Sequence, residues 1–284
     1  MKILVLGASG MLGNAIFRFL SRDKDCDVYG TARSEELKKY LDDSLAHKVI
    51  CNIDIENIDS LKRVFLEIKP DVVINCIGLI KQLAEVDDPL ITIPINALLP
   101  HRLARLCKIC NARFIHISTD CVFSGSRGNY NESDFCDADD LYGRSKLLGE
   151  VLYPHSITLR TSIIGHELFT KHALINWFLS QDKFVKGYKK AIFSGLPTVE
   201  LTRVIRDYVI PNVNLTGVFH VAVEPISKFD LLNLVADIYG KTIQIIPDDS
   251  VVINRSLNAS KFKKATGYIA PDWKDLVTMM HKFQ

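Results

Sequence analysis

The chain has 284 residues, of which 48% are hydrophobic and 24% charged, and its formal net charge at pH 7 is +2. This balance, without a sustained basic block, excludes a nucleic-acid-binding protein driven by charge. No stretch approaches eighteen uninterrupted apolar residues, so no membrane partner is expected. Seven cysteines, an odd number scattered along the chain, are typical of reduced thiols in the cytoplasm. No cluster of His, Cys and carboxylate residues has metal-ligand spacing, so no metal site is expected.

The amino terminus predicts a dinucleotide-binding turn. Ile3 to Leu6 form a continuous apolar run, as expected for a parallel strand buried on both faces. A G-x-x-G-x-x-G pattern follows and leads into an amphipathic helix. Glycines between a buried strand and a helix allow a tight turn and let a pyrophosphate approach the helix N-terminus. The expected cofactor contacts are Gly7, Ser9, Gly10, Met11, Leu12 and Gly13.

The residues after the second predicted strand, 27–31, indicate which cofactor is used. Chains that bind NAD usually place an acidic residue here to bind the ribose 2′-hydroxyl. This chain has Arg33 and Ser34 instead. A guanidinium and a hydroxyl suit a 2′-phosphate, which favours NADP(H). Glu35 and Glu36 follow directly and keep NAD(H) open.

Strands and helices alternate over the first 165 residues. This rhythm predicts an α/β fold, a Rossmann-type doubly wound parallel sheet. Further strands are predicted at 48–51, 71–75, 113–117 and 157–160, and helices at 58–68, 96–111 and 141–151. The alternation loosens after about residue 165. We therefore expect an NADP(H)-binding domain of residues 1–165 plus 217–238 and a smaller C-terminal substrate-binding lobe of residues 166–216 plus 239–284.

Ligands of such sheets bind beyond the carboxyl ends of the strands. Asp54 and Ile55 follow the third strand, where a carboxylate suits the adenine amino group and an apolar side chain suits the ring. Cys76, Ile77 and Gly78 follow the fourth strand, where a small residue lets a cofactor pass near the backbone. Ser118, Thr119 and Asp120 close the fifth strand. Hydroxyls there suit a substrate carbonyl, although all three residue types also favour a turn or helix cap.

Tyr142 and Lys146 are four residues apart, so they share one face of the predicted helix 141–151. An ammonium beside a phenol stabilises the phenolate and lowers a pKa that starts near 10. Such a phenol can exchange a proton near neutral pH. The spacing alone is common in helices. Its place after Ser118-Thr119-Asp120, in a chain that opens with a glycine turn, favours a catalytic interpretation.

These motifs together resemble the extended short-chain dehydrogenase/reductase superfamily. Residues 115–125, Ile-His-Ile-Ser-Thr-Asp-Cys-Val-Phe-Ser-Gly, are similar to the dTDP-4-dehydrorhamnose reductase branch, whose members commonly show S-T-D-Y-V-F-x-G. The segments 159–162, 195–199 and 217–220 extend the similarity into the carboxyl-terminal half, more loosely after about residue 165.

The resemblance implies reduction, by NADPH, of the keto group of a nucleotide-linked 4-keto-6-deoxy sugar for cell-surface polysaccharide biosynthesis. It implies Tyr142 as the general acid, Lys146 as the residue that binds the nicotinamide ribose, and Thr119 as the hydroxyl that contacts the substrate oxygen. Asn96 is implied on the cofactor side, acting on Lys146 through a water. The implied substrate contacts are Lys81, Ser118, Thr119, Asp120, Cys121 and Tyr142, with His166, Lys171 and Arg203 as candidates from the second lobe.

Cys121 stands where the branch usually has tyrosine, which leaves the sugar open. Two other functions also stay open: an epimerase or dehydratase of the same fold that retains NAD, and a noncatalytic regulatory subunit. Arg33 argues against the first, and the complete set of Thr119, Tyr142 and Lys146 argues against the second. A homodimer is compatible with the sequence.

Overall fold

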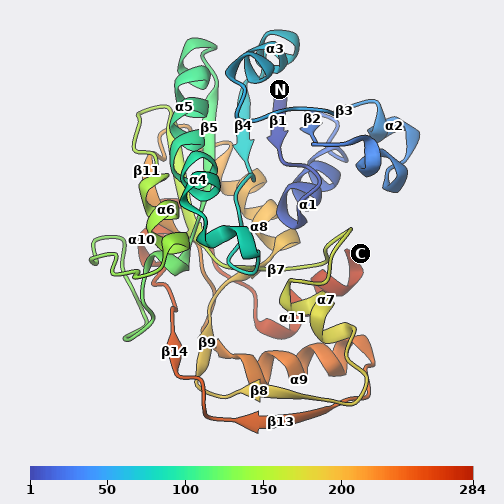
Figure 1. Ribbon diagram of the computed structural model, residues 1–284, viewed down its shortest axis with the longest axis vertical. Coiled ribbons are helices and arrows are strands. Elements are labelled where there is room, and N and C mark those ends of the chain that lie inside the picture. Colours follow the sequence, from blue (N-terminus) through green and yellow to red (C-terminus); the bar gives the residue numbers. More distant parts are fainter. Residues whose placement is uncertain (284) are drawn as a thin grey trace.

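The computed structural model describes residues 1–283, so Gln284, the last residue of the expected second lobe, lies outside the described residues. A seven-stranded parallel sheet dominates the molecule (Figure 1). Its strand order is β11-β6-β5-β4-β1-β2-β3, which confirms the predicted doubly wound Rossmann-type sheet. The strands are β1 (Lys2–Leu6), β2 (Asp27–Thr31), β3 (Val49–Ile50), β4 (Val72–Asn75), β5 (Arg113–Thr119), β6 (Ser156–Thr161) and β11 (Gly217–His220).

Helices cover both faces of the sheet, and each face has its own hydrophobic core. Side chains alternate along a strand, so Ile3 and Val5 pack beneath α1 and α8 while Leu4 and Leu6 pack beneath α3 and α5. This two-sided burial explains the uninterrupted apolar run of β1. The helices of this part are α1 (Met11–Leu20), α2 (Asp43–Ala46), α3 (Ile58–Ile68), α4 (Pro89–Thr92), α5 (Leu99–Ile109), α6 (Leu141–Leu148) and α8 (Thr198–Val204).

The helix expected over 96–111 begins earlier, at Pro89, and ends at Ile109. It consists of α4, a π-helical turn at Ile93–Leu98 and α5. Asp88 caps the first turn, since its Oδ1 accepts from the Leu90 N–H at 2.9 Å. Pro89 stands in the first turn, where the missing N–H costs little. Pro94 and Pro100 lie inside the helical run, where each removes a backbone donor, and the π-helical turn stands between α4 and α5. Strand β5 also runs two residues further than expected, to Thr119.

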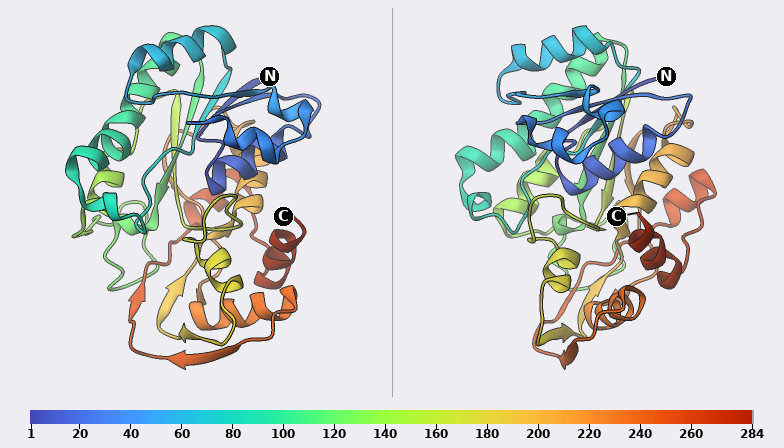
Figure 2. Two further views of the ribbon diagram at one scale, coloured as in Figure 1. Left: turned by 45° about the vertical axis from the view of Figure 1, so that its right-hand side comes forward. Right: turned by 90° about the vertical axis from the view of Figure 1, so that its right-hand side faces the viewer.

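A smaller group of elements lies below the carboxyl ends of the sheet strands (Figures 1 and 2). We call it the small lobe. It has its own core, formed largely by α7, β8, β9 and α9. Its elements are α7 (Leu174–Leu179), β8 (Phe184–Tyr188), β9 (Ala191–Phe193), β12 (Ile226–Ser227), α9 (Lys228–Tyr239), β13 (Gln244–Asp248) and β14 (Ile253–Asn254).

The packing differs from the expected lobe boundaries at two helices. α8 was expected in the second lobe, but its apolar face joins the sheet core beside α1. α9 was expected with the Rossmann domain, but it packs against β8 and β13 of the small lobe. The chain therefore crosses between the two parts more often than its loosening alternation indicated. Whether the two parts fold as separate domains stays a prediction.

The remaining elements connect the sheet to the small lobe. They are the paired strands β7 (Ile163–Ile164) and β10 (Leu196–Pro197), with α10 (Ser260–Thr266) and α11 (Trp273–Lys282). α11 packs against both α8 and α9, so it joins the two parts. Over residues 1–283, no helix combines the length and apolar character that crossing a membrane requires.

Candidate active site

The glycine turn after β1 forms an open cradle at the N-terminus of α1. Gly7 has a φ of +84°, a left-handed conformation that favours glycine. A Cβ on Gly13 would lie 2.1 Å from the Gly7 carbonyl oxygen, so close packing of helix on strand requires glycine there. The nearest atom to a Cβ on Gly10 would be 3.5 Å away. Protein contacts therefore do not require a glycine at position 10, whereas a ligand lying close to the backbone would.

The first turn of α1 has no side-chain cap. Gly10 occupies the N-cap position, and the first turn contains no acidic residue. By contrast, α3, α6 and α9 each have an N-cap side chain that accepts from a backbone N–H. Uncapped N–H groups at a helix N-terminus bind phosphate oxygens well. The neighbouring Ser9 and Met11 are half-buried, while the Leu12 side chain joins the core and leaves only its backbone to face the turn.

The residues expected around the adenosine lie at the ends of β2 and β3. Arg33 and Ser34 are exposed directly after β2. Glu35, one of the two acids that kept NAD(H) open, forms an ion pair with Lys38 at 2.8 Å. Asp54 is exposed after β3, and its Oδ1 accepts from the Glu56 N–H at 3.0 Å. The assignment of NADP(H) to Arg33 stays a prediction.

The turn after β4 approaches α6 closely. The Asn75 Oδ1 accepts from the Ile77 N–H at 3.1 Å and holds the Cys76-Ile77-Gly78 segment in place. A Cβ on Gly78 would lie 3.2 Å from Asn96 Oδ1 and 3.6 Å from Lys146 Nζ. Gly78 therefore lies beside Lys146, and its expected contact with the cofactor stays a prediction.

The Asn96 side chain is already satisfied by protein atoms. Its Oδ1 accepts from the Leu79 N–H at 2.9 Å, and its Nδ2 donates to Ser145 Oγ at 3.3 Å. It fixes the turn after β4 against α6. A water-mediated link from this residue to Lys146 stays a prediction.

Thr119, Tyr142 and Lys146 converge beyond the end of β5. Asp140 caps α6 by accepting from the Gly143 N–H at 2.7 Å, which places Tyr142 in the first turn. The Thr119 hydroxyl lies near enough to the Tyr142 phenol to lower its pKa. Lys146 is only 6% exposed, and its Nζ donates to the Ile117 carbonyl oxygen at 2.8 Å. One strand end and one helix turn therefore bring together the three predicted catalytic residues.

The electrostatics of this group differ from the expectation. Burial raises the pKa of the Tyr142 phenol, the charges at Cys121 and Asp120 raise it further, and the Thr119 hydrogen bond opposes them. Burial lowers the pKa of Lys146 to about 8. The net shift of the phenol pKa is upward, against the predicted lowering, and the Lys146 ammonium donates to the Ile117 carbonyl. Tyr142 is therefore a protonated donor at neutral pH.

Ser118 points to the other side of β5 from Thr119. Its hydroxyl donates to Glu150 Oε1 at 2.7 Å. Arg160 pairs with the same carboxylate through two hydrogen bonds of 2.7 Å, and both charged side chains are 6% exposed. The Arg160 Nη1 also lies 3.3 Å from His220 Nε2. Ser118 belongs to this buried network, so its geometry does not support the expected substrate contact.

Asp120 and Cys121 form a short turn that carries the first residues after β5. Asp120 is buried, and its Oδ1 accepts from Thr119 Oγ1 at 3.2 Å and from Cys121 Sγ at 3.5 Å. Lys81 forms an ion pair with the capping Asp140 at 2.5 Å. It joins the turn after β4 to the start of α6, so its charge is already neutralised.

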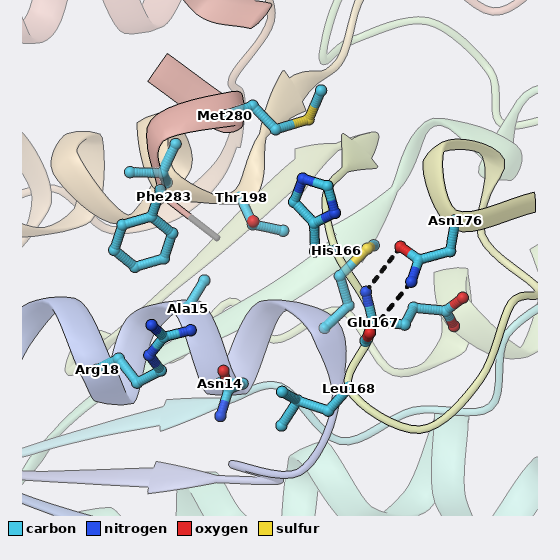
Figure 3. Close-up of a pocket in the computed structure, with 12 residues that line it drawn as sticks. Asn14, Ala15, Arg18, His166, Glu167, Leu168, Asn176, Thr198, Met280 and Phe283 are labelled. Atoms are coloured by element: carbon cyan, nitrogen blue, oxygen red, sulfur yellow. Dashed lines mark hydrogen bonds between the residues drawn. The ribbon is translucent and has the colours of Figure 1, made fainter. Parts of the chain in front are cut away.

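The expected second-lobe candidates lie apart from Tyr142. His166 Nε2 is 2.8 Å from the Tyr239 hydroxyl, and Arg203 pairs with Glu200 at 2.9 Å. Lys171 is exposed. His166 lines a cavity of about 160 Å³ between α1 and the small lobe, which Figure 3 shows opposite Asn14 of α1. None of the three expected residues has a contact with the Thr119–Tyr142 pair.

Lys228 and Arg255 were missed by the sequence analysis. Lys228 opens α9, and Arg255 follows β14. Their charges act on Asp120 and Cys121 at the start of the site. Both residues lie outside every motif that indicated chemistry, so no local signal in the sequence identified them.

Relatives of the chain carry two kinds of name, reductase and methionine adenosyltransferase 2 subunit beta. A "probable low-salt glycan biosynthesis reductase Agl14" from Haloferax volcanii is 34% identical over 169 residues, which cover 58% of this chain and about half, 54%, of that protein. A dTDP-4-dehydrorhamnose reductase from Aggregatibacter actinomycetemcomitans is 24% identical over 96% of both chains. A methionine adenosyltransferase 2 subunit beta from Danio rerio is 28% identical over 84% of this chain and 74% of its own.

Solved structures of similar shape carry the same name. A dTDP-4-dehydrorhamnose reductase from Clostridium acetobutylicum has a TM-score of 0.81 and 26% identity over 99% of both chains. A dTDP-4-dehydrorhamnose reductase from Bacillus anthracis, solved in complex with NADP, has a TM-score of 0.81 at 20% identity over 100% of this chain and 98% of its own. At that identity the second likeness supports the fold alone.

The family assignment rests on the whole described chain rather than on one motif. The model of the RmlD substrate binding domain matches residues 1–283, which include the glycine turn, β5 with its following turn, α6 and the small lobe. The resemblance to the dTDP-4-dehydrorhamnose reductase branch is thereby confirmed at the level of the family. The chain belongs to the RmlD substrate binding domain family.

Proposed function

We propose that this chain uses NADPH to reduce the keto group of a nucleotide-linked 4-keto-6-deoxy sugar, as one step in making a cell-surface polysaccharide sugar. The observation that carries the proposal is the placement of Tyr142 beside the Thr119 hydroxyl at the end of β5, with Lys146 buried four residues further along α6. The reductase names of the relatives and of the solved structures support it. Those names describe the other proteins, and their transfer to this chain is part of the proposal.

The residues present fit a dinucleotide. The uncapped N-terminus of α1 suits the diphosphate, and the exposed Arg33 suits a ribose 2′-phosphate. Gly78 leaves room beside Lys146 for a ribose. When bound, NADPH supplies the hydride that the keto carbon accepts.

The chain's own residues supply the proton and the orientation. Tyr142 donates a proton to the keto oxygen as general acid, and burial keeps its phenol protonated at neutral pH. Thr119 sits beside the phenol, and its hydroxyl hydrogen, which points to Asp120 Oδ1 in the absence of substrate, turns to donate to the same oxygen and orients the carbonyl. Lys146 binds the ribose hydroxyls on the other side of the phenol. The Tyr142 and Thr119 hydroxyls lie in a largely buried site, where hydrogen bonds are stronger than in water.

The test is NADPH oxidation by the purified chain with dTDP-, UDP- and GDP-linked 4-keto-6-deoxy sugars, followed by the absorbance of NADPH. We expect turnover with at least one of them. Tightly bound NAD without net consumption of NADPH would instead indicate an epimerase or dehydratase. The likeness to the Danio rerio subunit makes a regulatory role the second candidate. That role predicts no turnover with any of the three substrates.

The choice of cofactor has its own test. Arg33→Asp places a carboxylate where we propose that the 2′-phosphate binds, so it should weaken NADPH binding through charge repulsion and affect NADH much less. The dissociation constants of both cofactors, measured by fluorescence titration, check this. Equal weakening of both would contradict the role of Arg33 and leave NAD(H) as the cofactor.

We further propose that the protein acts in the cytoplasm as a homodimer. All seven cysteines are free thiols, as expected in a reducing compartment. Leu90, Leu148 and Leu152 lie on or near α4 and α6 and are 83%, 64% and 71% exposed, which is typical of an interface between copies. Light scattering would measure the state of the wild type, and Leu148→Glu should shift a dimer toward monomers.

A further inference from the structure

Two cations of the small lobe lie beside the turn that follows β5. Arg255 Nε donates to the Phe123 carbonyl oxygen at 2.8 Å. A Cβ on Gly125 would lie 2.9 Å from Arg255 Cγ, so the arginine stem packs directly on this segment. Lys228 is the first residue of α9, and its charge acts on Asp120, Cys121 and Arg255. The two cations therefore act on the turn that directly follows Thr119.

Neither cation has an ion-pair partner in the part of the chain that the structure describes. Other cations are neutralised, since each pairs with a carboxylate at 2.5 to 2.9 Å: Lys81, Arg160 and Arg203. Lys228 and Arg255 form no such pair. The one hydrogen bond of the Arg255 guanidinium uses its Nε and leaves both terminal amino groups available.

The surroundings of Lys228 disfavour a cation in the absence of a ligand. Burial lowers the pKa of Lys228, Asp120 and Cys121 raise it, and Arg255 lowers it again. The residue also sits at the N-terminus of α9, the end of a helix where a positive charge is unfavourable. Asp120 compensates only in part, because burial raises the pKa of its carboxyl group against the effect of Arg255 and Lys228. A bound anion would relieve all of these costs.

We propose that Arg255 and Lys228 bind the diphosphate of the sugar nucleotide, so that the sugar spans from this pair to the Tyr142 phenol. This proposal rests on the proposed function. In a sugar nucleotide with a 4-keto group, the keto carbon and the diphosphate lie at opposite ends of the pyranose ring. The terminal amino groups of a guanidinium match two phosphate oxygens, and an ammonium adds a point charge.

A second source of diphosphate, the cofactor, must be distinguished from the substrate. The uncapped N-terminus of α1 is the place that we assign to the cofactor diphosphate, and it belongs to a different part of the molecule from Arg255 and Lys228. Substitutions at Arg255 and Lys228 should therefore act on the sugar nucleotide alone. Measuring both ligands with each variant separates the two sources.

The experiment measures the affinity of the full-length protein for dTDP, UDP and GDP by calorimetry in the presence of NADP⁺. Lys228→Met and Arg255→Met each remove one charge while keeping an unbranched stem. Each change should weaken the affinity for the nucleoside diphosphate that the wild type binds by about tenfold or more, as for one lost charge-assisted hydrogen bond. NADPH affinity should stay within about twofold of the wild type, a change well below the 1.4 kcal/mol that tenfold represents.

The control is Lys264→Met, which removes an exposed lysine of α10 at a distance from the motifs of the site. It should leave both affinities unchanged. Arg255→Met also removes the hydrogen bond to Phe123, so its melting temperature is measured alongside. Lys228→Met breaks no hydrogen bond to a described residue and therefore tests the proposal without that complication.

A kinetic readout separates binding from a purely structural role. With an active sugar nucleotide, both variants should raise KM and leave kcat nearly unchanged, whereas a displaced Thr119 would lower kcat. The proposal is overturned if the wild type binds none of the three nucleoside diphosphates, or if both variants bind as the wild type does. If diphosphate binding depends on both cations but no 4-keto sugar is reduced, this site stands and the proposed function fails.

Discussion

Ser118 and Thr119 are neighbours in β5, yet their hydroxyls take part in two different kinds of polar group. Ser118 donates to Glu150, whose carboxylate is held by two hydrogen bonds from Arg160, so every charge on that side has its partner. Thr119 lies beside Tyr142, next to Lys146, whose only hydrogen bond to a described residue goes to the Ile117 backbone carbonyl. The two sides of one strand end are equally buried but differ in how completely their charges are compensated.

The comparison separates a stabilising network from a reactive one. A buried charge with a complete set of partners gains little by changing its proton count, so it holds the fold in one arrangement. A buried acid or base without a full set has a shifted pKa and keeps donors available for a ligand. We expect substitutions on the Ser118 side to change stability and those on the Thr119 side to change turnover.

The largest effect should come from breaking the Glu150–Arg160 pair. Glu150→Ala leaves the Arg160 guanidinium buried and unpaired, which typically costs about 3–5 kcal/mol in the free energy of unfolding. Denaturation in urea measures it. Asp59→Ala, which removes an exposed partner of Lys62, should change stability by less than about 1 kcal/mol. A loss of similar size in both variants would show that the buried network has no special role.

Tyr142→Phe should produce the largest effect on turnover. Without the phenol, the keto oxygen has no positioned general acid, so we expect kcat to fall about 10²-fold or more. NADPH affinity and the urea midpoint should change little, because the ring and its packing remain. Steady-state kinetics and cofactor titration check both statements. Near-normal kcat would mean that another group supplies the proton.

A matched pair of substitutions tests the two sides of β5 directly. Thr119→Val keeps the shape of the side chain and removes the hydroxyl, which donates to Asp120 Oδ1 and accepts from the Cys121 N–H. It also removes the proposed donor to the keto oxygen, so kcat should fall several-fold to tenfold. Ser118→Ala removes a hydrogen bond to a carboxylate and should cost about 1.5–3 kcal/mol of stability with little change in kcat. If the two variants exchange these effects, the assignment of the faces is wrong.

The sequence predicted the sheet and the cofactor turn because their signals are local. The apolar run of β1, the three glycines and the four-residue spacing of Tyr142 and Lys146 each lie within one short segment. The assignment of Ser118 to the substrate is not supported, because the strand was predicted to end at Ile117. The strand continues to Thr119, so Ser118 and Thr119 point to opposite faces of the sheet. The positions of Lys228 and Arg255 near the turn after β5 depend on how the small lobe packs against the sheet, which no local pattern encodes.

The smallest predicted effect is a pH dependence that links the two sides. Burial lowers the pKa of Lys146 to about 8, and the charge of Glu150 opposes that lowering. Below pH 8 the lysine is charged in both the folded and the unfolded chain, so its burial weakens the fold. Between about pH 8 and the ordinary pKa of 10.5, the unfolded chain holds this proton more fully than the folded chain does. The penalty therefore fades as the pH rises through this range. Turnover should show the opposite trend.

The charged form of Lys146 holds the ribose in the proposed mechanism, so kcat should be about half its neutral value near pH 8 and fall further above it. Lys146→Arg keeps its charge throughout this range, and its pH profile should lack the decline whatever its absolute rate. Glu150→Gln removes the charge that opposes the shift, so the decline should begin at lower pH. A wild-type profile that stays flat to pH 9 would show that Lys146 does not act through its charge.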